Sequence, residues 1–567
     1  MKNGRSLKKN PMKRLAALLL PAALCLSLLA GCARAGEGVA LSVCVGPAPD
    51  TLDPIYAASI TDQTILVHLY ENLMRVTADG SGGTSVVAGM AKSVDQEENY
   101  DGTVTYTFRL RSAKWSDGQT VKASDFVYAW QRLADPASGS PYAELLSVVS
   151  GYDEARSAGD MTLLQVTAKN DTTLVVTLNG TYDWFLKEVC TSPATMPLRQ
   201  DVVQRLKTAA IEAVADDEDA TADPWWADPT ALVTNGAYVA ADYAGGVSLL
   251  VSASERYYGD QLGPKEITFQ FAATVEDAAT LYAQKAVDAV WPLTEERLAE
   301  LAEDEAWSAI PELGTYTLLF NCRQDPFADP LIRQALAAAI DRNALARTAS
   351  VVALAAEGLV PPGVPENDEG GFRAVGGALL DNDPETYEER CAQAKALLEA
   401  AGYDSGANLG ELEYLYVDEG TNGLVAQALC QQWQDTLRVQ VTPRGVTERE
   451  LWTALRTGEY TLAGVDLEAA GNDAECFLMD WTSDSQDNVT GYENSAYDTL
   501  MAIIASASDG TARMGCLHDA EELLLTDYAL SPLYTRGTAW ELRDTLTGAF
   551  RDARGWFCFS GVMARTT

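Results

Sequence analysis

Residues 101–118 read DGTVTYTFRLRSAKWSDG and combine a strand, a turn and the approach to a helix. Apolar and polar residues alternate over 104–110, which predicts a strand with one buried face. Asp117 and Gly118 supply a turn, and apolar residues then recur at helical spacing over 126–133. Strand and helix patterns mix in this way along the rest of the chain, so we expect an α/β fold.

Composition narrows the class of protein. The chain has 567 residues, enough for about three or four domains. Hydrophobic residues form 47% of it and the mean hydropathy is −0.08, which excludes a disordered chain and a multi-span membrane protein. A net charge of −40 argues against nucleic-acid binding. Because His68 and His518 are the only histidines, we expect no metal site and no cofactor.

The N-terminus has the pattern of an export signal. The first 14 residues hold six basic side chains and no acidic one, and an apolar run follows over 15–30. This run is shorter than the ~20 residues that a membrane span needs. It ends in Leu29-Ala30-Gly31-Cys32, which looks like a bacterial lipobox. We therefore expect a signal peptide at 1–31 and a lipid on Cys32 that holds the protein on the outer face of a membrane.

The remaining cysteines and two helix starts are also readable. Eight cysteines follow Cys32, far apart and without a C-x-x-C pair, so neither a zinc site nor a redox motif is indicated. Export permits disulfides, and buried free thiols fit equally well. Asp329-Pro330 and Asp383-Pro384 each place a capping carboxylate before a proline, which predicts helices starting there. The acidic residues 216–219 are interpreted as a solvated loop.

Several motifs, in order along nearly the whole mature chain, resemble those of the bacterial peptide-binding lipoproteins, solute-binding family 5 of ABC importers. Residues 101–118 are close to the most diagnostic stretch of that family, and residues 69–73 match its Leu-Tyr-Glu-x-Leu. Further matches are Thr51-Leu52-Asp53-Pro54, residues 125–142, 234–238, 256–259 and 320–341, and Ser531-Pro532-Leu533-Tyr534. These motifs are expected to build the fold rather than to mark a site.

The resemblance implies an α/β, periplasmic-binding-protein-like fold of class II (cluster C), with two hinged α/β lobes and an extra inserted lobe. Lobe I is expected at residues 33–75, 231–318 and 533–567, lobe II at 76–230, and lobe III at 319–532. The ligand would lie between lobes I and III, and hinge closure would bury it.

The resemblance also implies a receptor rather than an enzyme. A monomer would capture an oligopeptide and deliver it to a membrane permease with its ATPase subunits. The peptide would add as an extended strand, with its side chains in roomy, wet pockets. One set of main-chain contacts maps to Gln63, Thr64 and Ile65, and Tyr142 is a pocket candidate because its local sequence matches the family. Further aromatic candidates are Trp433, Trp452 and Tyr534.

The second set of ligand contacts maps to a segment that departs from the family pattern Trp-x-x-Asp-Tyr-x-Asp-Pro-x-x-Phe-Leu. With the register fixed at Phe477, the family Trp falls at Leu467, and the Asp that holds the peptide's α-ammonium falls at Ala470. The Tyr and Pro are also replaced, and Asp473 alone remains. An ammonium buried without a carboxylate costs about 2–5 kcal/mol, so this loss bears on the ligand.

Two explanations of the missing carboxylate stay open. If the segment is extended, Asp466 and Glu468 point the same way as position 470, with Ala469 between, and either acid could hold the ammonium. Asp473 has the wrong parity unless the chain turns before it. Alternatively, these are ordinary surface acids and the ligand has no free amine, as in a capped or cyclic peptide or a glycan fragment.

Two other classes of function, an enzyme and a signalling receptor, are alternatives to a transport receptor. An exported hydrolase could use paired carboxylates, but the sequence has no nucleophile elbow, H-E-x-x-H or phosphate loop. A receptor that passes a peptide to a partner without import fits the sequence as well as transport does.

Overall fold

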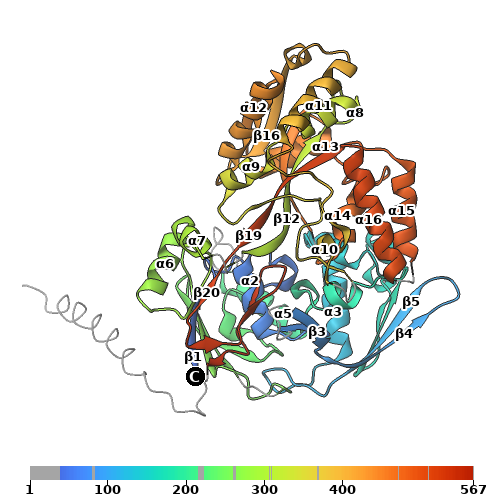
Figure 1. Cartoon of the computed structure of the whole chain (residues 1–567). Coiled ribbons are helices and arrows are strands. Elements are labelled where there is room, and N and C mark those ends of the chain that lie inside the picture. Colours follow the sequence, from blue (N-terminus) through green and yellow to red (C-terminus); the bar gives the residue numbers. More distant parts are fainter. Residues whose placement is uncertain are drawn as a thin grey trace, which may run out of the picture.

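The computed structural model describes residues 39–78, 84–214, 223–259, 263–304, 307, 309–366, 370–469, 471–507 and 510–565. The signal peptide, Cys32, Ala470 and the acidic residues 216–219 lie outside these ranges. Within them the chain forms two six-stranded sheets and one four-stranded sheet, together with short hairpins (Figure 1).

The first sheet has the strand order β20-β11-β1-β10-β9-β8 and draws on three separate parts of the chain. Its strands are β1 (Ala40–Cys44), β8 (Tyr238–Ala244), β9 (Ser248–Ala253), β10 (Glu266–Gln270), β11 (Ala289–Val290) and β20 (Glu541–Leu542). β1 runs parallel to both of its neighbours, β10 and β11. Its helices are α2 (Ile60–Leu69), α6 (Val275–Ala283) and α7 (Glu295–Ala302).

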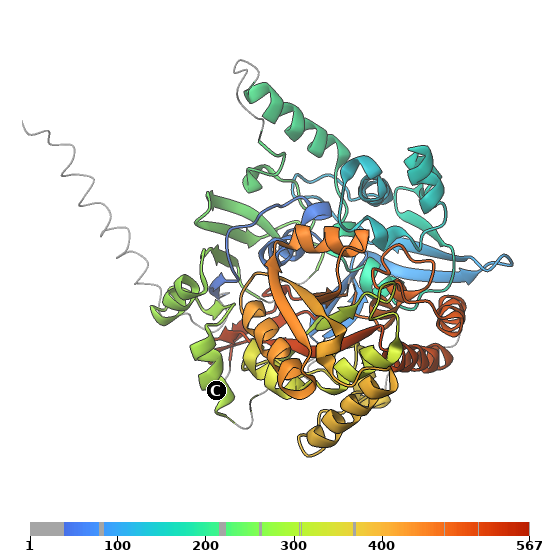
Figure 2. The same cartoon turned by 90° about the horizontal axis from the view of Figure 1, so that it is seen from above.

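The four-stranded sheet is antiparallel, in the order β4-β5-β7-β6. Its strands are β4 (Ala91–Glu98), β5 (Val104–Leu110), β6 (Val166–Asn170) and β7 (Thr173–Leu178). Beside it lie the hairpin β2 (Met74–Ala78) and β3 (Thr84–Ala88), and the helices α3 (Ala123–Ala134), α4 (Tyr152–Ala158) and α5 (Gln200–Ala213). Figure 2 shows β4 and β5 reaching outward from the side of the molecule.

The strand, turn and helix predicted from residues 101–133 are confirmed as β5, a turn and α3. β5 alternates buried and more exposed residues as expected. Gly118 has a φ of 91°, which glycine adopts without strain, and its N–H donates to Trp115 O at 2.8 Å. Phe108 on β5 and Trp130 on α3 then join the same core as Phe269 of the first sheet.

The second six-stranded sheet has the order β13-β19-β12-β18-β16-β17. Its strands are β12 (Ile310–Phe320), β13 (Leu354–Ala355), β16 (Glu411–Val417), β17 (Gln440–Val446), β18 (Leu462–Glu468) and β19 (Leu530–Thr538). Helices cover both faces, so neighbouring residues of one strand enter different cores: Leu318 and Phe320 pack with one set of helices and Leu319 with the other. The helices are α8 (Pro330–Ala338), α9 (Arg342–Ala349), α11 (Tyr387–Ala400), α12 (Asn422–Leu437), α13 (Glu448–Thr457), α15 (Ser495–Ser506) and α16 (Gly510–Thr526).

Short elements complete the description. They are α10 (Phe372–Gly376), α14 (Glu475–Leu478), β14 (Pro365–Glu366), β15 (Gly370–Gly371), β21 (Leu546–Thr547), β22 (Phe550–Arg551), β23 (Phe557–Cys558) and β24 (Met563–Ala564). The eight cysteines after Cys32 are all free thiols.

One of the two predicted helix starts is confirmed and the other is wrong. α8 begins at Pro330, and the Asp329 carboxylate accepts the Leu331 N–H at 2.9 Å. α11 begins at Tyr387 rather than at Pro384. The Asp383 carboxylate accepts the N–H of Glu385 at 2.9 Å, so it closes a turn before the helix instead of capping the helix itself.

β12 and β19 form the long connection between the two six-stranded sheets. They pair antiparallel with two irregularities in register, and β19 is followed directly by β20 in the first sheet. Figure 1 shows both strands running from the upper part of the molecule down toward β20. The space beside this pair holds the largest cavity described below.

Candidate binding cleft

A cavity of about 790 Å³ lies between the second sheet and the segment around α7. Its walls come from the C-terminal part of β18, the adjoining ends of β12 and β19, helix α13, and the segment 476–481. On the opposite side, Trp291, Pro292, Leu293 and Leu298 form an apolar wall. The cavity is thus bounded by the second sheet and by the segment that follows β11 of the first sheet, so movement of one sheet against the other would change its width.

β18 has a free edge inside this cavity. It pairs with β12 along its whole length, but with β16 only at its first two residues. The Ala469 N–H donates to Leu313 O of the β12 strand end at 3.2 Å, and this sets the alternation of the pair. The main-chain groups of Gly464, Asp466 and Glu468 therefore point away from β12. In the described part of the chain, no further strand pairs with them on that side.

Asp466 and Glu468 lie on one face of β18, as the two-residue spacing predicted, and both are held by Arg536 of β19. The Arg536 Nη1 lies 2.9 Å from Asp466 Oδ2, and its Nη2 donates to Glu468. Burial raises the pKa of Asp466 to about 6, although Arg536 opposes the shift. Glu312 of β12 adds a third carboxylate, 3.0 Å from Arg551.

Asp480 is a different kind of carboxylate. It lines the same cavity, is half-buried, and makes no hydrogen bond or ion pair with any residue that the structure describes. Burial raises its pKa to about 6, and the negative charge of Asp487 adds to this effect. A second cavity of about 430 Å³ shares Asp480 with the first, together with Trp452, Leu467 and Trp481. This side pocket thus opens beside Asp480, the half-buried cleft carboxylate for which the described residues supply no cation.

The loop after β18 is fixed by a buried ion-pair cluster. Asp473 is buried, and both of its carboxylate oxygens accept bonds from Arg513 of α16, at 2.7 and 3.2 Å. Arg513 also lies 2.6 Å from Glu475, which accepts the indole N–H of Trp184 at 3.1 Å. Asp473 therefore holds this loop against α16, with both of its oxygens occupied.

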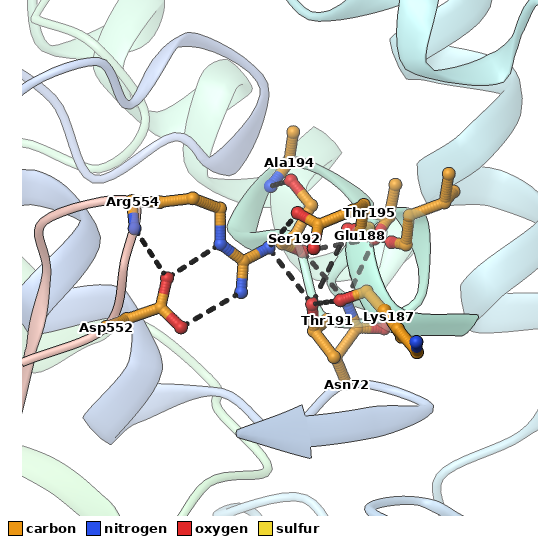
Figure 3. Close-up of polar contacts among 10 residues, drawn as sticks. Asn72, Lys187, Glu188, Thr191, Ser192, Ala194, Thr195, Asp552 and Arg554 are labelled. Carbon is orange, nitrogen blue, oxygen red and sulfur yellow. Dashed lines mark hydrogen bonds and ion pairs between the residues drawn. The ribbon is translucent and has the colours of Figure 1, made fainter. Parts of the chain in front are cut away.

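A second polar cluster joins the C-terminal hairpin to the π-helical turn at Phe185–Val189. Arg554 lies 3.0 Å from the Thr191 hydroxyl and 3.5 Å from Glu188, and its Nε donates to Asp552 at 2.7 Å (Figure 3). Burial raises the pKa of Glu188, and Arg554 opposes this. Gly471 packs against the Glu188 side chain, so this cluster lies directly behind the loop that follows β18.

The predicted contact residues on α2 have different surroundings. Thr64 and Ile65 are fully buried. The Thr64 hydroxyl accepts the Phe557 N–H at 3.0 Å, which ties α2 to β23. Gln63 is half-buried and its amide donates to Ala57 O at 3.2 Å. Burial raises the pKa of the neighbouring Tyr142 phenol, and the charges of Asp62 and Glu468 add to this shift. Gln63, Tyr142 and Glu468 are thus brought into one neighbourhood, whereas Thr64 and Ile65 belong to the core.

Two of the aromatic candidates line the cavity. Trp452 and Tyr534 both do so, as do Leu467 and Ala469. Trp433 does not, because it is fully buried and its indole N–H donates to Leu336 O at 2.9 Å. The core of α12 therefore accounts for Trp433.

Sequence reasoning missed Arg536, Asp480 and Trp481. Arg536 could have been found, because it follows the family motif ending at Tyr534 by two residues and so shares its face of β19. Nothing in the local sequence singles out Asp480, whose place depends on how the chain turns after α14. The sequence has twelve tryptophans, and no local pattern distinguishes Trp481 from the others.

Comparison with known sequences identifies the protein family. The sequence model of the bacterial extracellular solute-binding proteins, family 5, matches residues 85–499. The chain belongs to this family. Members of this family bind solutes and are not enzymes, which excludes the exported hydrolase considered from the sequence. The cleft is consistent with solute binding. Among the residues that the structure describes, no helix is both long and apolar enough to span a bilayer.

Individual relatives differ in the ligands that their names give. A protein of Escherichia coli named as a probable deoxycholate-binding periplasmic protein, YgiS, is 30% identical over 86% of each chain. The periplasmic oligopeptide-binding protein OppA of the same organism is 29% identical, also over 86% of each chain. Haemophilus influenzae OppA, solved in complex with RPPGFSPFR, is 25% identical with a TM-score of 0.69, covering 94% of this chain and 100% of that one.

The fold itself matches further solved structures. The unliganded open form of the murein tripeptide-binding protein MppA gives a TM-score of 0.74 at 24% identity, over 94% of this chain and 98% of that one. The periplasmic-binding-protein-like α/β fold predicted from the sequence is therefore confirmed.

Proposed function

We propose that this protein is the lipid-anchored, extracytoplasmic receptor of an ABC importer, and that it captures oligopeptides in the 790 Å³ cleft. It then presents them to a membrane permease with its ATPase subunits. The first sheet belongs to the proposed lobe I, the four-stranded sheet to lobe II, and most of the second sheet to lobe III. The proposed limits at residues 318–319 and 532–533 fall inside β12 and β19, the strands that connect the sheets.

The free edge of β18 is the observation that carries the proposal. Three residues of this strand direct main-chain groups into the cleft, where no strand of the described residues pairs with them. An extended peptide can pair with such an edge, because every peptide has the same main-chain donors and acceptors. The side chains of alternate residues would then enter the surrounding space. This explains how one cleft could accept many sequences.

Electrostatics favours a peptide over an anionic ligand. Among the described residues, Arg536 is the single cation that lines the cavity, against seven carboxylates. These are Glu295, Glu312, Glu419, Glu448, Asp466, Glu468 and Asp480. An anion would be repelled by this set, whereas a free amine or a basic side chain would be attracted. Gln63, Tyr142, Asp466, Leu467, Glu468 and Ala469, with Ala470 and Asp473 in the adjoining loop, remain the proposed ligand-binding region.

The test is direct analysis of the bound ligand. The domain from residue 33 to the C-terminus should be purified without denaturation, and its small-molecule content identified by mass spectrometry. We expect oligopeptides, and titration of the stripped protein with those peptides should reproduce the binding. Recovery of a single non-peptide compound that rebinds tightly would overturn the proposal.

A second candidate is a non-peptide or amine-blocked ligand on the same fold. The segment after β18 favours it, because the family carboxylate is replaced by Ala470, and one relative is named for deoxycholate. Sensing of a peptide without transport also fits the cleft, and a deletion of the permease would separate the two, since only transport requires it.

The anchor has its own test. Cys32→Ser should abolish incorporation of labelled fatty acid and leave the signal peptide uncleaved by the lipoprotein peptidase. Unchanged labelling in this variant would exclude Cys32 as the attachment site.

A further inference from the structure

The carboxylates of the cleft fall into three groups by their surroundings. Glu312, Asp466 and Glu468 are paired with arginines of the protein. Glu295, Glu419 and Glu448 are exposed at the rim, where water solvates them. Asp480 alone is half-buried without a cation among the described residues. A desolvated carboxylate of this kind is unfavourable unless a partner arrives.

The surroundings of Asp480 suit a cation from outside the protein. Trp452 and Trp481 line both cavities beside it. The face of an indole attracts ammonium and guanidinium groups, and a neighbouring carboxylate strengthens this preference. Leu467 of β18 completes the shared wall, so the mouth of the side pocket lies next to the free strand edge.

The basic residues of the side pocket do not neutralise Asp480. Arg449 and Arg456 are exposed on α13, and Arg456 lies over the Trp452 ring at 5.8 Å from its centroid. Neither forms an ion pair with Asp480, and the charge that acts on its carboxyl group is the negative one of Asp487. Asp480 is thus the half-buried charged residue of the side pocket, whereas Asp487, Arg449 and Arg456 are exposed.

We propose that Asp480 is the counter-ion for a cationic group of the ligand, an ammonium or guanidinium, which binds at the mouth of the side pocket lined by Trp452 and Trp481. This inference rests on the proposed function and names the chemistry of its ligand. It also changes the expected role of Glu468, because Arg536 already occupies that carboxylate. The missing family carboxylate at position 470 would then be replaced from a different segment, 476–481.

The experiment compares matched peptides and matched variants by calorimetric titration at pH 7.5. The α-ammonium is the single cationic group of free-amine trialanine, and N-acetyl-trialanine has no cationic group. A single lysine placed in turn at each position of N-acetyl-trialanine supplies a side-chain ammonium, with glutamine at the same positions as the neutral match. The proteins are wild type, Asp480→Asn, Glu468→Gln, and Asp484→Asn as a control at an exposed carboxylate that lines neither cavity. A second variant, Asp480→Ser, guards against an effect of one substitution on folding.

We expect Asp480→Asn and Asp480→Ser to weaken the cationic peptides about tenfold or more, the scale for removing one partner of a desolvated charge pair. The affinities of N-acetyl-trialanine and the glutamine peptides should change little, and Asp484→Asn should leave the affinities of all peptides nearly unchanged. If only trialanine binds the Asp480 variants more weakly, the site holds the α-ammonium. If only the lysine peptides bind them more weakly, the site holds a side-chain ammonium.

Two outcomes would overturn the inference. If the cationic peptides bind and are indifferent to both Asp480 variants, Asp480 is not the counter-ion, while peptide binding itself stands. If wild type binds none of these peptides, the proposed function and the inference both fail.

Discussion

At the residue scale, Arg536 lies among three carboxylates. Its replacement should show how much this arginine contributes to the stability of the fold around the cleft. Arg536→Gln leaves the half-buried Asp466 without a cation. We expect the free energy of unfolding at pH 7.5 to fall by about 1–2 kcal/mol, measured by urea denaturation. The double variant with Asp466→Asn should recover part of this loss, because the unpaired charge is then absent.

The matched control for this change is an exposed pair in the same sheet. Arg444 lies 2.9 Å from Glu413 at the surface, and Arg444→Gln should cost less than about 0.5 kcal/mol. Equal losses for Arg444→Gln and Arg536→Gln would mean that the cleft pair is no stronger than a surface one.

Asp480 gives a second prediction at this scale, a trade-off between stability and binding. Its pKa is raised to about 6 by burial, so the folded protein holds this proton more tightly than the unfolded chain does. Stability relative to a neutral side chain therefore rises as the pH falls through about 6 toward 4, and is lowest above 6. Asp480→Asn should raise the free energy of unfolding by about 1 kcal/mol at pH 7.5, while cation binding falls.

The measurement is thermal or urea unfolding of both proteins between pH 7.5 and 4. The difference in free energy of unfolding between Asp480→Asn and wild type should disappear as Asp480 becomes protonated. Other groups near this carboxyl are Asp487, Tyr497, Arg449 and Arg456. They are present in both proteins, as is Asp466, so the difference between the curves reports Asp480. An Asn variant that is less stable at pH 7.5 would contradict the desolvation argument.

At the scale of the element, the free edge of β18 predicts a periodic response of the ligand. If a peptide pairs with Gly464, Asp466 and Glu468, every second main-chain N–H of the peptide faces the strand. N-methylation at those positions should weaken binding about tenfold each, since it removes the donor and adds bulk. The intervening positions should tolerate the same change. Uniform tolerance along the peptide, measured by titration, would exclude strand addition at this edge.

The sequence predicted the regular elements far better than the site, and the reason is physical. The alternation in β5 and the cap of α8 are local patterns, because each depends only on residues a few positions apart in the chain. The start of α11 was wrong because an Asp-Pro pair also begins turns. Trp433 was indistinguishable from a cleft aromatic, because burial of a side chain depends on which helix packs over it.

The site shows the same limit more strongly. The shared face of Asp466 and Glu468 followed from strand periodicity and is confirmed. Arg536, which lies 68 residues beyond Glu468 in the chain, neutralises both acids through a pairing of strands that no local pattern reveals. Asp480 acquires its role only because the chain turns after α14 and returns it to the cleft. Long-range contacts of this kind decide which of many acids is left without a cation.

At the scale of the whole molecule, the position of β12 and β19 predicts a hinge. These strands connect the two six-stranded sheets, and their pairing is irregular between Pro311 and Thr315 and between Tyr316 and Thr317. Irregular pairing leaves fewer hydrogen bonds to resist bending. The cavity lies beside these strands and is lined from both sides, so rotation about them would narrow it around a ligand.

Ligand should therefore make the protein more compact and more stable at once. A verified peptide at 100 times its dissociation constant should raise the free energy of unfolding by about 2.7 kcal/mol through mass action alone. X-ray scattering of the same samples should show a smaller radius of gyration, because the second sheet moves toward the first and expels water from the cleft. Asp480→Asn serves as the control: a cationic peptide that binds it tenfold more weakly is then at ten times its dissociation constant, so the stabilisation should fall to about 1.4 kcal/mol. Stabilisation without compaction in wild type would mean that the ligand binds to a cleft that does not close, and the two strands would then be a rigid connection rather than a hinge.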